Sequence, residues 1–307
     1  MIYTLTLNPA LDYTVFAEGL TVGAVNRAGG FSISYGGKGI NVSAMLKNLN
    51  VSSVALGFIA GFTGNELEKL LLNEGINFDF IKLKSGITRI NVKIREKSET
   101  DINVQGPCAS ADELNLLYKK LNKLEHGDWL VLSGSIPSGM PSDIYARLSE
   151  FAEKRGARVI IDAVGCALTD SLYTKPFLIK PNREELGDIF GEEISGISDA
   201  FFYAEKLKAE GAKNVMITLG GEGSALICEN GERLYCSAAD GAVLNTVGAG
   251  DSAVAGFIAG YSENGCYKNA LKLSAAAGGA TAFSNGIGNA ELVNRLRSSI
   301  SVKEYAQ

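Results

Sequence analysis

Histidine is almost absent from this chain. The 307 residues contain a single one, His126, in the stretch L-E-H-G-D, which reads as a surface turn. A Ser-His-Asp or Cys-His mechanism would have to use that imidazole, and no G-x-S-x-G turn for a nucleophilic serine occurs. The 5 cysteines are scattered, odd in number and without a C-x-x-C pair. This pattern argues against a disulfide framework or a zinc site.

Positive charge and long apolar runs are also scarce. The chain has 29 Lys and Arg against 34 Asp and Glu, a formal net charge of -5, and no basic run of the kind that binds nucleic acid. No apolar run reaches the ~18 residues of a membrane span. The first nine residues lack the basic and apolar regions of a signal peptide. The sequence therefore predicts a cytoplasmic protein that binds neither nucleic acid nor membrane, while a few placed cations would suffice for an anionic small molecule.

Proline is rare and glycine abundant, 6 against 36, which predicts regular elements joined by tight glycine turns. Short β-branched runs alternate with segments of helical periodicity, in which Val42, Met45 and Leu46 are an example. This alternation predicts a mostly parallel sheet covered by helices on both faces, an α/β fold. The expected strands are 128–132, 158–162, 177–180 and 215–219.

Two stretches, 3–35 and 88–105, break this rhythm because they alternate like strands and contain little helix. The second reads as a hairpin with a charged turn. We expect these pieces to pair as a small β-sheet lid that excludes water from a cleft. The predicted organisation is one domain over residues 1–307 with lid segments at about 10–35 and 88–105. The exposed edges of such a lid could pair with a second copy and form a homodimer.

Three S/T/N-x-x-E patterns predict helix starts with capping boxes. Two are Thr63 with Glu66 and Ser110 with Glu113. The third lies in K-P-N-R-E-E-L at 180–186, where Asn182 and Glu185 have the same spacing. Those two side chains, with Lys180 beside them, would equally suit a metal–phosphate site.

Glycine-rich junctions between strands and helices are the candidate ligand sites, because open α/β sheets bind ligands beyond the carboxyl ends of their strands. Y-G-G-K-G-I-N-V at 35–42 would place Lys38 and Asn41 at the start of a helix, although it also reads as a plain turn. It is not a Walker A loop, because Gly39 follows the lysine where Ser or Thr is required. T-L-G-G-E-G-S-A at 218–225 precedes a hairpin with an E-N-G-E turn and would line a nucleotide or simply turn the chain.

The stretch G-A-G-D-S-A at 248–253 matches G-x-G-x-x-A, but helical sequence follows it where a dinucleotide fold needs a strand. What remains is a helix N-terminus with free N–H groups and a partial charge of roughly +0.5, which suits an anion. Asp251 then has two compatible interpretations. It is an N-terminal cap that contributes about 1 kcal/mol, or a catalytic group that accepts a proton beside an anion hole.

Five elements in fixed order are more specific than any one of them. G-G-K-G-I-N-V, T-R-I-N-V-K-I, L-S-G-S-I-P-S-G, I-K-P-N-R-E-E-L and N-T-V-G-A-G-D-S follow one another along the chain. In this respect the whole sequence resembles the PfkB sugar kinases of the ribokinase-like superfamily. The resemblance implies a central, mostly parallel sheet flanked by helices, a β-sheet lid over the sugar site, and transfer of phosphate from ATP with Mg²⁺.

The opening T-L-N-P-A-L-D and the stretch G-F-I-A-G-F-T-G look most like members that convert fructose 1-phosphate to fructose 1,6-bisphosphate, with tagatose 6-phosphate as the neighbouring substrate. A kinase for an unphosphorylated sugar or nucleoside, and a sugar-phosphate sensor without catalysis, are the alternatives. The expected partners are therefore ATP and a small sugar phosphate.

The resemblance also assigns roles by matching position. It makes Asp251 the general base and forms the anion hole from Gly248, Ala249 and Gly250. The residues it assigns to the sugar phosphate are Asp12, Gly37, Lys38, Asn41, Arg89 and, as a weaker match, Arg27. Those it assigns to the nucleotide are Lys180, Asn182, Thr218, Gly220, Gly223 and Ser284. Glu185 would organise Mg²⁺ through water, and the backbone of Asn245 and Val247 would hold a monovalent cation such as K⁺.

Overall fold

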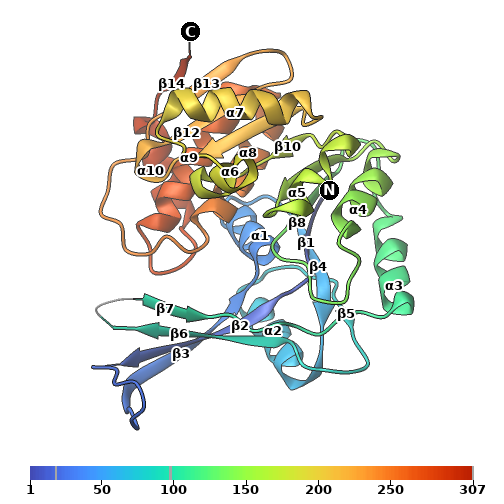
Figure 1. Ribbon diagram of the computed structural model, residues 1–307, viewed down its shortest axis with the longest axis vertical. Coiled ribbons are helices and arrows are strands. Elements are labelled where there is room, and N and C mark those ends of the chain that lie inside the picture. The colour runs from blue at the N-terminus through green and yellow to red at the C-terminus, as the bar shows by residue number, and fades with distance from the viewer. Residues whose placement is uncertain (18, 97–98, 306–307) are drawn as a thin grey trace.

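The computed structural model describes residues 1–17, 19–96 and 99–305, and their strands form two sheets (Figure 1). The larger is a 10-stranded sheet. Its strands, in spatial order, are β14 (Val302–Glu304), β13 (Arg233–Cys236), β12 (Ser224–Ile227), β11 (Asn214–Thr218), β10 (Leu178–Ile179), β9 (Arg158–Asp162), β8 (Trp129–Ser133), β1 (Ile2–Thr6), β4 (Val54–Ile59) and β5 (Ile81–Lys82). Neighbours from β11 to β5 run parallel, whereas β12, β13 and β14 are antiparallel. The expected parallel core and the hairpin at E-N-G-E are both present.

Helices cover both faces of this sheet. One face carries α1 (Lys38–Asn48), α8 (Ala249–Asn264), α9 (Tyr267–Ala282) and α10 (Ala290–Ser299), and the other carries α3 (Ala111–Leu121), α4 (Ile144–Glu153), α6 (Arg183–Phe190) and α7 (Ile197–Ala209). Residues of β8 alternate between the two cores, with Leu130 and Leu132 in one and Trp129 and Val131 in the other. A strand buried on both faces must be apolar throughout, which explains its unbroken hydrophobic sequence. Within the described ranges, no helix combines the length and the hydropathy needed to cross a membrane.

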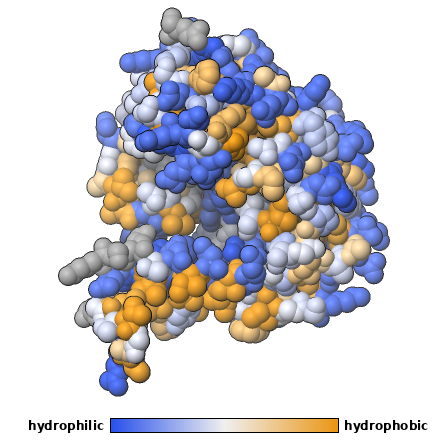
Figure 2. All heavy atoms as spheres, in the orientation of Figure 1, coloured by the Kyte–Doolittle hydropathy of each residue, from blue (hydrophilic) through white to orange (hydrophobic). Residues whose placement is uncertain are grey.

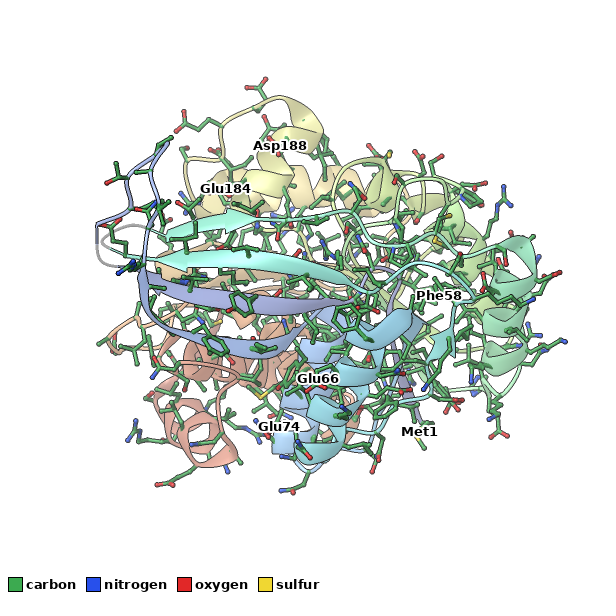
Figure 3. All side chains as sticks on the ribbon, turned by 90° about the horizontal axis from the view of Figure 1, so that it is seen from below. Met1, Phe58, Glu66, Glu74, Glu184 and Asp188 are labelled. Atoms are coloured by element: carbon green, nitrogen blue, oxygen red, sulfur yellow. The ribbon has the colours of Figure 1, made fainter. Side chains whose placement is uncertain are left out.

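The second sheet, called the lid sheet below, has the strand order β3 (Ala28–Gly36), β2 (Ala10–Ala17), β6 (Arg89–Arg95) and β7 (Glu99–Ile102) and projects from the body (Figure 1). Tyr13 pairs with Ile33, and Asp12 pairs with Asn91. Because side chains alternate along strands, apolar residues line one face and polar residues the other. The α2 helix (Gly61–Asn73) lies beside this sheet, with Glu66 near the strands (Figure 3).

The alternating stretch 3–35 is divided between the two sheets. The stretch 3–35 begins with most of β1, which pairs with β4 and β8 in the large sheet. Only β2 and β3 of that stretch enter the lid sheet. Local alternation predicted strands correctly there, but which sheet a strand joins is decided by its distant partners.

Two of the three capping boxes are confirmed, at Ser110 with Glu113 and at Asn182 with Glu185. The prediction at Thr63 is wrong. The α2 helix already begins at Gly61, and Thr63 Oγ1 donates to the carbonyl of Thr88 at 2.7 Å. Gly61 has a φ of +60°, which lets the chain turn into the helix before Thr63 is reached.

Candidate active site

Two glycine-rich helix starts meet at the carboxyl edge of the large sheet. The first is Gly37–Asn41 at the start of α1, and the second is Gly248–Asp251 at the start of α8. Asn41 Nδ2 donates to Asp251 Oδ2 at 2.8 Å and joins them. Gly248 has a φ of +82°, and a Cβ there would lie 2.9 Å from Ile287 Cδ1. Only glycine fits this turn without strain, so the close approach of the two helix starts explains the glycine.

Asp251 does not cap its helix. The N-cap is Gly248 without a side-chain bond, and Asp251 lies within the first turn, 5 % exposed. The left-handed backbone of Gly248 starts the helix at Ala249, two residues before the aspartate. The capping prediction is therefore wrong. Burial, reinforced by the nearby Asp162, raises the pKa of Asp251 to about 6 against the opposing effect of Lys38, Asn41 and Lys180.

The N-cap and first turn of α8 leave several N–H groups free. Ala249 N donates to the carbonyl of Thr246 at 3.2 Å, so this member of the expected anion hole is engaged. The N–H groups of Gly248, Gly250 and Asp251 have no acceptor among the described residues. Free donors at a helix N-terminus attract an anion, so the turn keeps this capacity without Ala249.

Asp162 is a site residue that sequence reasoning missed. It ends β9 with 0 % exposure, and its Oδ1 lies 3.1 Å from Lys38 Nζ and 3.4 Å from Lys180 Nζ. Burial would raise the pKa of Asp162, but Lys180 and Lys38 outweigh burial and lower it. The sequence did contain a signal for Asp162, because this acid ends the apolar run V-I-I-D at the carboxyl end of a strand, where α/β sheets bind ligands.

The 180–185 segment brings its predicted residues to the same place. Glu185 Oε2 accepts the N–H of Asn182 at 2.9 Å, whereas Oε1 lies 3.7 Å from Lys38 Nζ. Thr218 N donates to the carbonyl of Pro181 at 3.2 Å and thereby sets the end of β11 beside this segment. The capping box thus uses one carboxylate oxygen of Glu185 and leaves the other facing Lys38.

The remaining nucleotide and cation candidates lie in loops. Gly223 has a φ of +99°, and a Cβ there would collide with the carbonyl of Cys236, whereas Gly220 faces open space. Ser284 Oγ donates to the carbonyl of Ala280 at 2.8 Å. In the loop before α8, Val247 N donates to Asn245 Oδ1 at 3.0 Å. These contacts give Gly223 and Ser284 structural roles of their own.

The polar face of the lid sheet carries a second cluster. Asp12 Oδ1 accepts from Asn91 Nδ2 at 2.9 Å, and Asp12 Oδ2 lies 3.1 Å from Lys93 Nζ. Neither Asn91 nor Lys93 was predicted, although both share a strand face with Arg89. Arg27 is exposed between β2 and β3. It makes no hydrogen bond or ion pair with the residues that the structure describes.

Arg89 lies at the base of the lid sheet. Its Nε donates to the carbonyl of Asn8 at 3.1 Å and its Nη1 to that of Val104 at 3.2 Å. Figure 2 shows the surface hollowed between the lid sheet and the larger body, with hydrophilic residues along the border of the hollow. The two clusters therefore supply cations and carboxylates from both the body and the lid.

The chain matches the model of the pfkB family carbohydrate kinases over residues 5–293. It is 43% identical over 302 residues to a 1-phosphofructokinase of Bacillus subtilis, with 98% of this chain and 99% of that protein covered. A D-tagatose-1-phosphate kinase of Bacillus licheniformis is 39% identical over 304 residues, covering 98% and 99%. The structure of phosphofructokinase-2 from Escherichia coli in complex with potassium superposes with a TM-score of 0.91 at 28% identity, covering 97% and 98%.

Proposed function

The chain belongs to the pfkB family of carbohydrate kinases, and we propose that it phosphorylates D-fructose 1-phosphate to fructose 1,6-bisphosphate at the expense of ATP. The observation that carries the chemistry is the buried carboxylate of Asp251 at a helix start that presents free N–H groups. A base and an anion site within one turn suit transfer of a phosphoryl group to an alcohol.

In the proposed reaction, the acceptor hydroxyl oxygen forms a bond to the γ-phosphorus as the bond from that phosphorus to the β,γ-bridging oxygen breaks. ADP leaves with the electron pair, and the hydroxyl proton passes to Asp251. The transition state is loose, so the alcohol becomes acidic only as the new bond forms and the proton moves late. The free N–H groups at Gly248 and Gly250 would stabilise charge on the transferred group.

The residues present fit Mg²⁺ that is held mainly by phosphates and water. Among the described residues, no group of three His, Cys, Asp or Glu side chains could hold a metal alone. Glu185 has one oxygen free of its capping bond, which suits contact with the ion through water. When bound, Mg²⁺ neutralises phosphate charge. The carbonyls of Asn245 and Val247 stay candidates for K⁺, which a comparison of rates with and without KCl would test.

The second cluster, which comprises Asp12, Asn91 and Lys93 on the lid sheet and is called the lid cluster below, is proposed to bind the acceptor together with the adjacent Arg89. Asp12 would accept hydrogen bonds from sugar hydroxyls, and Arg89 would pair with the acceptor's own phosphate. The alternative substrate is D-tagatose 1-phosphate, because the relative from Bacillus licheniformis is named a kinase of that sugar phosphate. It replaces tagatose 6-phosphate as the neighbouring candidate. A kinase that draws on ATP in sugar metabolism is expected in the cytoplasm.

Initial rates with several acceptors test this assignment. We expect kcat/KM for fructose 1-phosphate to exceed that for D-tagatose 1-phosphate, tagatose 6-phosphate, fructose 6-phosphate and fructose. The physical reason is that a charged pocket built for one phosphate position loses its ion pairs when the phosphate is moved or missing. A higher kcat/KM with D-tagatose 1-phosphate would reassign the substrate. Binding of fructose 1-phosphate without turnover would indicate a sensor.

The apolar face of the lid sheet is proposed to bind a second copy of the chain. Phe62 is 69% exposed and lines a groove of about 490 Å³ beside α2, and Phe31, which is 63% exposed, stacks on Tyr13 of the same groove. The groove is lined by Leu11, Tyr13, Ile33, Phe62, Thr63, Asn65, Glu66, Lys69 and Ile90. Glu66 and Lys69, which pair with each other at 2.9 Å, place both signs of charge at its margin, which suits a self-complementary contact. An apolar surface with a polar border is typical of an interface.

Phe31→Asp is expected to shift the protein from dimer to monomer in sedimentation equilibrium, since a carboxylate buried at the interface would lose its water. Phe202→Asp is the matched control, because Phe202 is also 56% exposed but lies on α7. A wild-type protein that sediments as a monomer would refute the dimer.

A further inference from the structure

Ionisable side chains from separate parts of the chain converge beneath the starts of α1 and α8. Asp162 Oδ1 is the centre, in contact with Lys38 at 3.1 Å and Lys180 at 3.4 Å. Lys38 Nζ also lies 3.7 Å from Glu185 Oε1. A Cβ added to Gly250 would lie 3.3 Å from Lys180 Nζ, so this ammonium lies directly against the first turn of α8. One carboxylate oxygen thus links two cations around the proposed anion site.

The floor of this cluster is polar and only partly satisfied. Strand register aligns Thr6, Ser133 and Asp162 across β1, β8 and β9. Thr6 Oγ1, Ser133 Oγ and Asp162 Oδ2 are buried without hydrogen-bond partners among the described residues. Buried polar groups without partners lower the stability of the fold. In a buried ion pair, the attraction between the charges often does not exceed the free energy needed to remove them from water. Stability alone therefore gives no reason for a charged group at position 162.

The contacts of Lys38 place it with the transfer machinery. Burial alone would lower the pKa of Lys38, but Asp162, Asp251 and Glu185 outweigh burial and raise it, so the side chain stays an ammonium. Arg89, in contrast, contacts the backbone of Asn8 and Val104 near the lid sheet. The two cations that sequence reasoning assigned to one sugar phosphate have no partner in common.

We propose that Asp162 is a positioning residue that holds the ammonium groups of Lys38 and Lys180 at the start of α8, and that Lys38 acts on the phosphoryl group in transfer instead of on the acceptor's own phosphate. Lysine carries a point charge on a long flexible stem, so its effect on a transition state depends on what fixes it. A displacement of about 1 Å in such a group can cost roughly 10²-fold in rate. The inference rests on the proposed kinase function.

Steady-state kinetics of three variants test this role. Lys38→Met is expected to lower kcat about 10²- to 10³-fold, as loss of one transition-state donor does, with KM for fructose 1-phosphate within about 3-fold of wild type. Asp162→Asn keeps the shape but not the charge, and is expected to lower kcat about 10- to 10²-fold with the same unchanged KM. Because Asp162 acts in part through Lys38, the double variant should lose much less than the product of the two single losses. Glu153→Gln is the control, since it neutralises a partly buried acid paired with Lys213 at 3.4 Å on the remote α4.

The results separate the two hypotheses. If Lys38→Met raises KM for fructose 1-phosphate at least 10-fold while kcat holds, Lys38 binds the acceptor phosphate and the inference fails. If Asp162→Asn keeps kcat, or if the double variant loses the full product, Asp162 does not position Lys38. Should Asp162→Asn not fold, the KM and kcat split of Lys38→Met decides. If the wild type is inactive with fructose 1-phosphate, that result contradicts the proposed function and leaves the role of Asp162 to be tested separately. The crystal structure of Asp162→Asn is that test. A Lys38 ammonium in the same place as in the wild type would show that Asp162 does not position it.

Discussion

Replacement of Asp251 by asparagine is expected to lower kcat about 10²- to 10⁴-fold, because the amide cannot take the proton of the acceptor hydroxyl. The side chain keeps its shape, and its amide oxygen can still accept from Asn41. Binding of ATP, measured by calorimetry, should therefore stay close to the wild-type value. Asp143→Asn, at an exposed pair with Arg147, is the matched control. Turnover close to wild type in Asp251→Asn would rule out the base.

The same variant should be more stable than the wild type at neutral pH. The pKa of Asp251 is raised from 3.8 to about 6 in the folded protein, so folding disfavours its charged form. The resulting penalty is absent below pH 3.8, grows between the two values and is complete above about 6. It is on the order of 1–3 kcal/mol. Thermal melts should accordingly show a higher Tm for Asp251→Asn at pH 8, with the gap closing towards pH 4.

Catalysis should show the opposite dependence on pH. The base must be ionised, so kcat/KM should fall as pH drops through about 6, the pKa of the buried carboxylate. The acceptor phosphate also titrates near ~6, so the rate profile alone does not identify the group. The difference in Tm between wild type and Asp251→Asn does, because no substrate is present. A gap in Tm that does not change with pH would contradict the raised pKa.

Replacement of Arg89 by alanine is the second large effect expected. It should raise KM for fructose 1-phosphate about 10²-fold or more, since a guanidinium–phosphate pair contributes two charge-assisted hydrogen bonds. The KM for ATP should change less than about 3-fold, because Arg89 contacts Asn8 and Val104 and shares no partner with Lys180. Arg89→Lys should be intermediate, because lysine keeps the charge but loses the paired geometry.

Arg147→Ala is the control for this variant, because its guanidinium is exposed on α4 and pairs with Asp143. Fructose without a phosphate offers a second comparison. If Arg89 binds the phosphate, its loss should leave the weak rate with fructose unchanged. An equal rise in KM for ATP and for fructose 1-phosphate would assign Arg89 a general role in lid structure.

Much of the fold was predictable because it depends on short-range physics. The apolar runs of β8 and β9, buried on both faces, fixed their identity as strands. The period-two pattern of 88–105 indicated a two-faced hairpin, and Asn182 with Glu185 predicted the start of α6. In each case, neighbours along the chain supply the periodicity or the hydrogen bonds.

Other features followed only from the tertiary structure. The α8 helix begins three residues earlier than an N-cap at Asp251 requires, because Gly248, with its left-handed backbone, is the N-cap. The different partners of Lys38 and Arg89, and the whole contribution of Asp162, depend on contacts between residues far apart in sequence. No local pattern reports them.

The sequence by itself determined the alternation of strands and helices, the glycine junctions and the family. The tertiary structure decided which sheet β1 joins, which oxygen of Glu185 is free and which carboxylate holds Lys38. The reason is that propensity and capping act over a few residues, whereas the partner of a buried charge is set by the order in which distant strands pair. Asp162 therefore becomes recognisable only when β9 lies between β8 and β10 and its carboxylate meets both lysines.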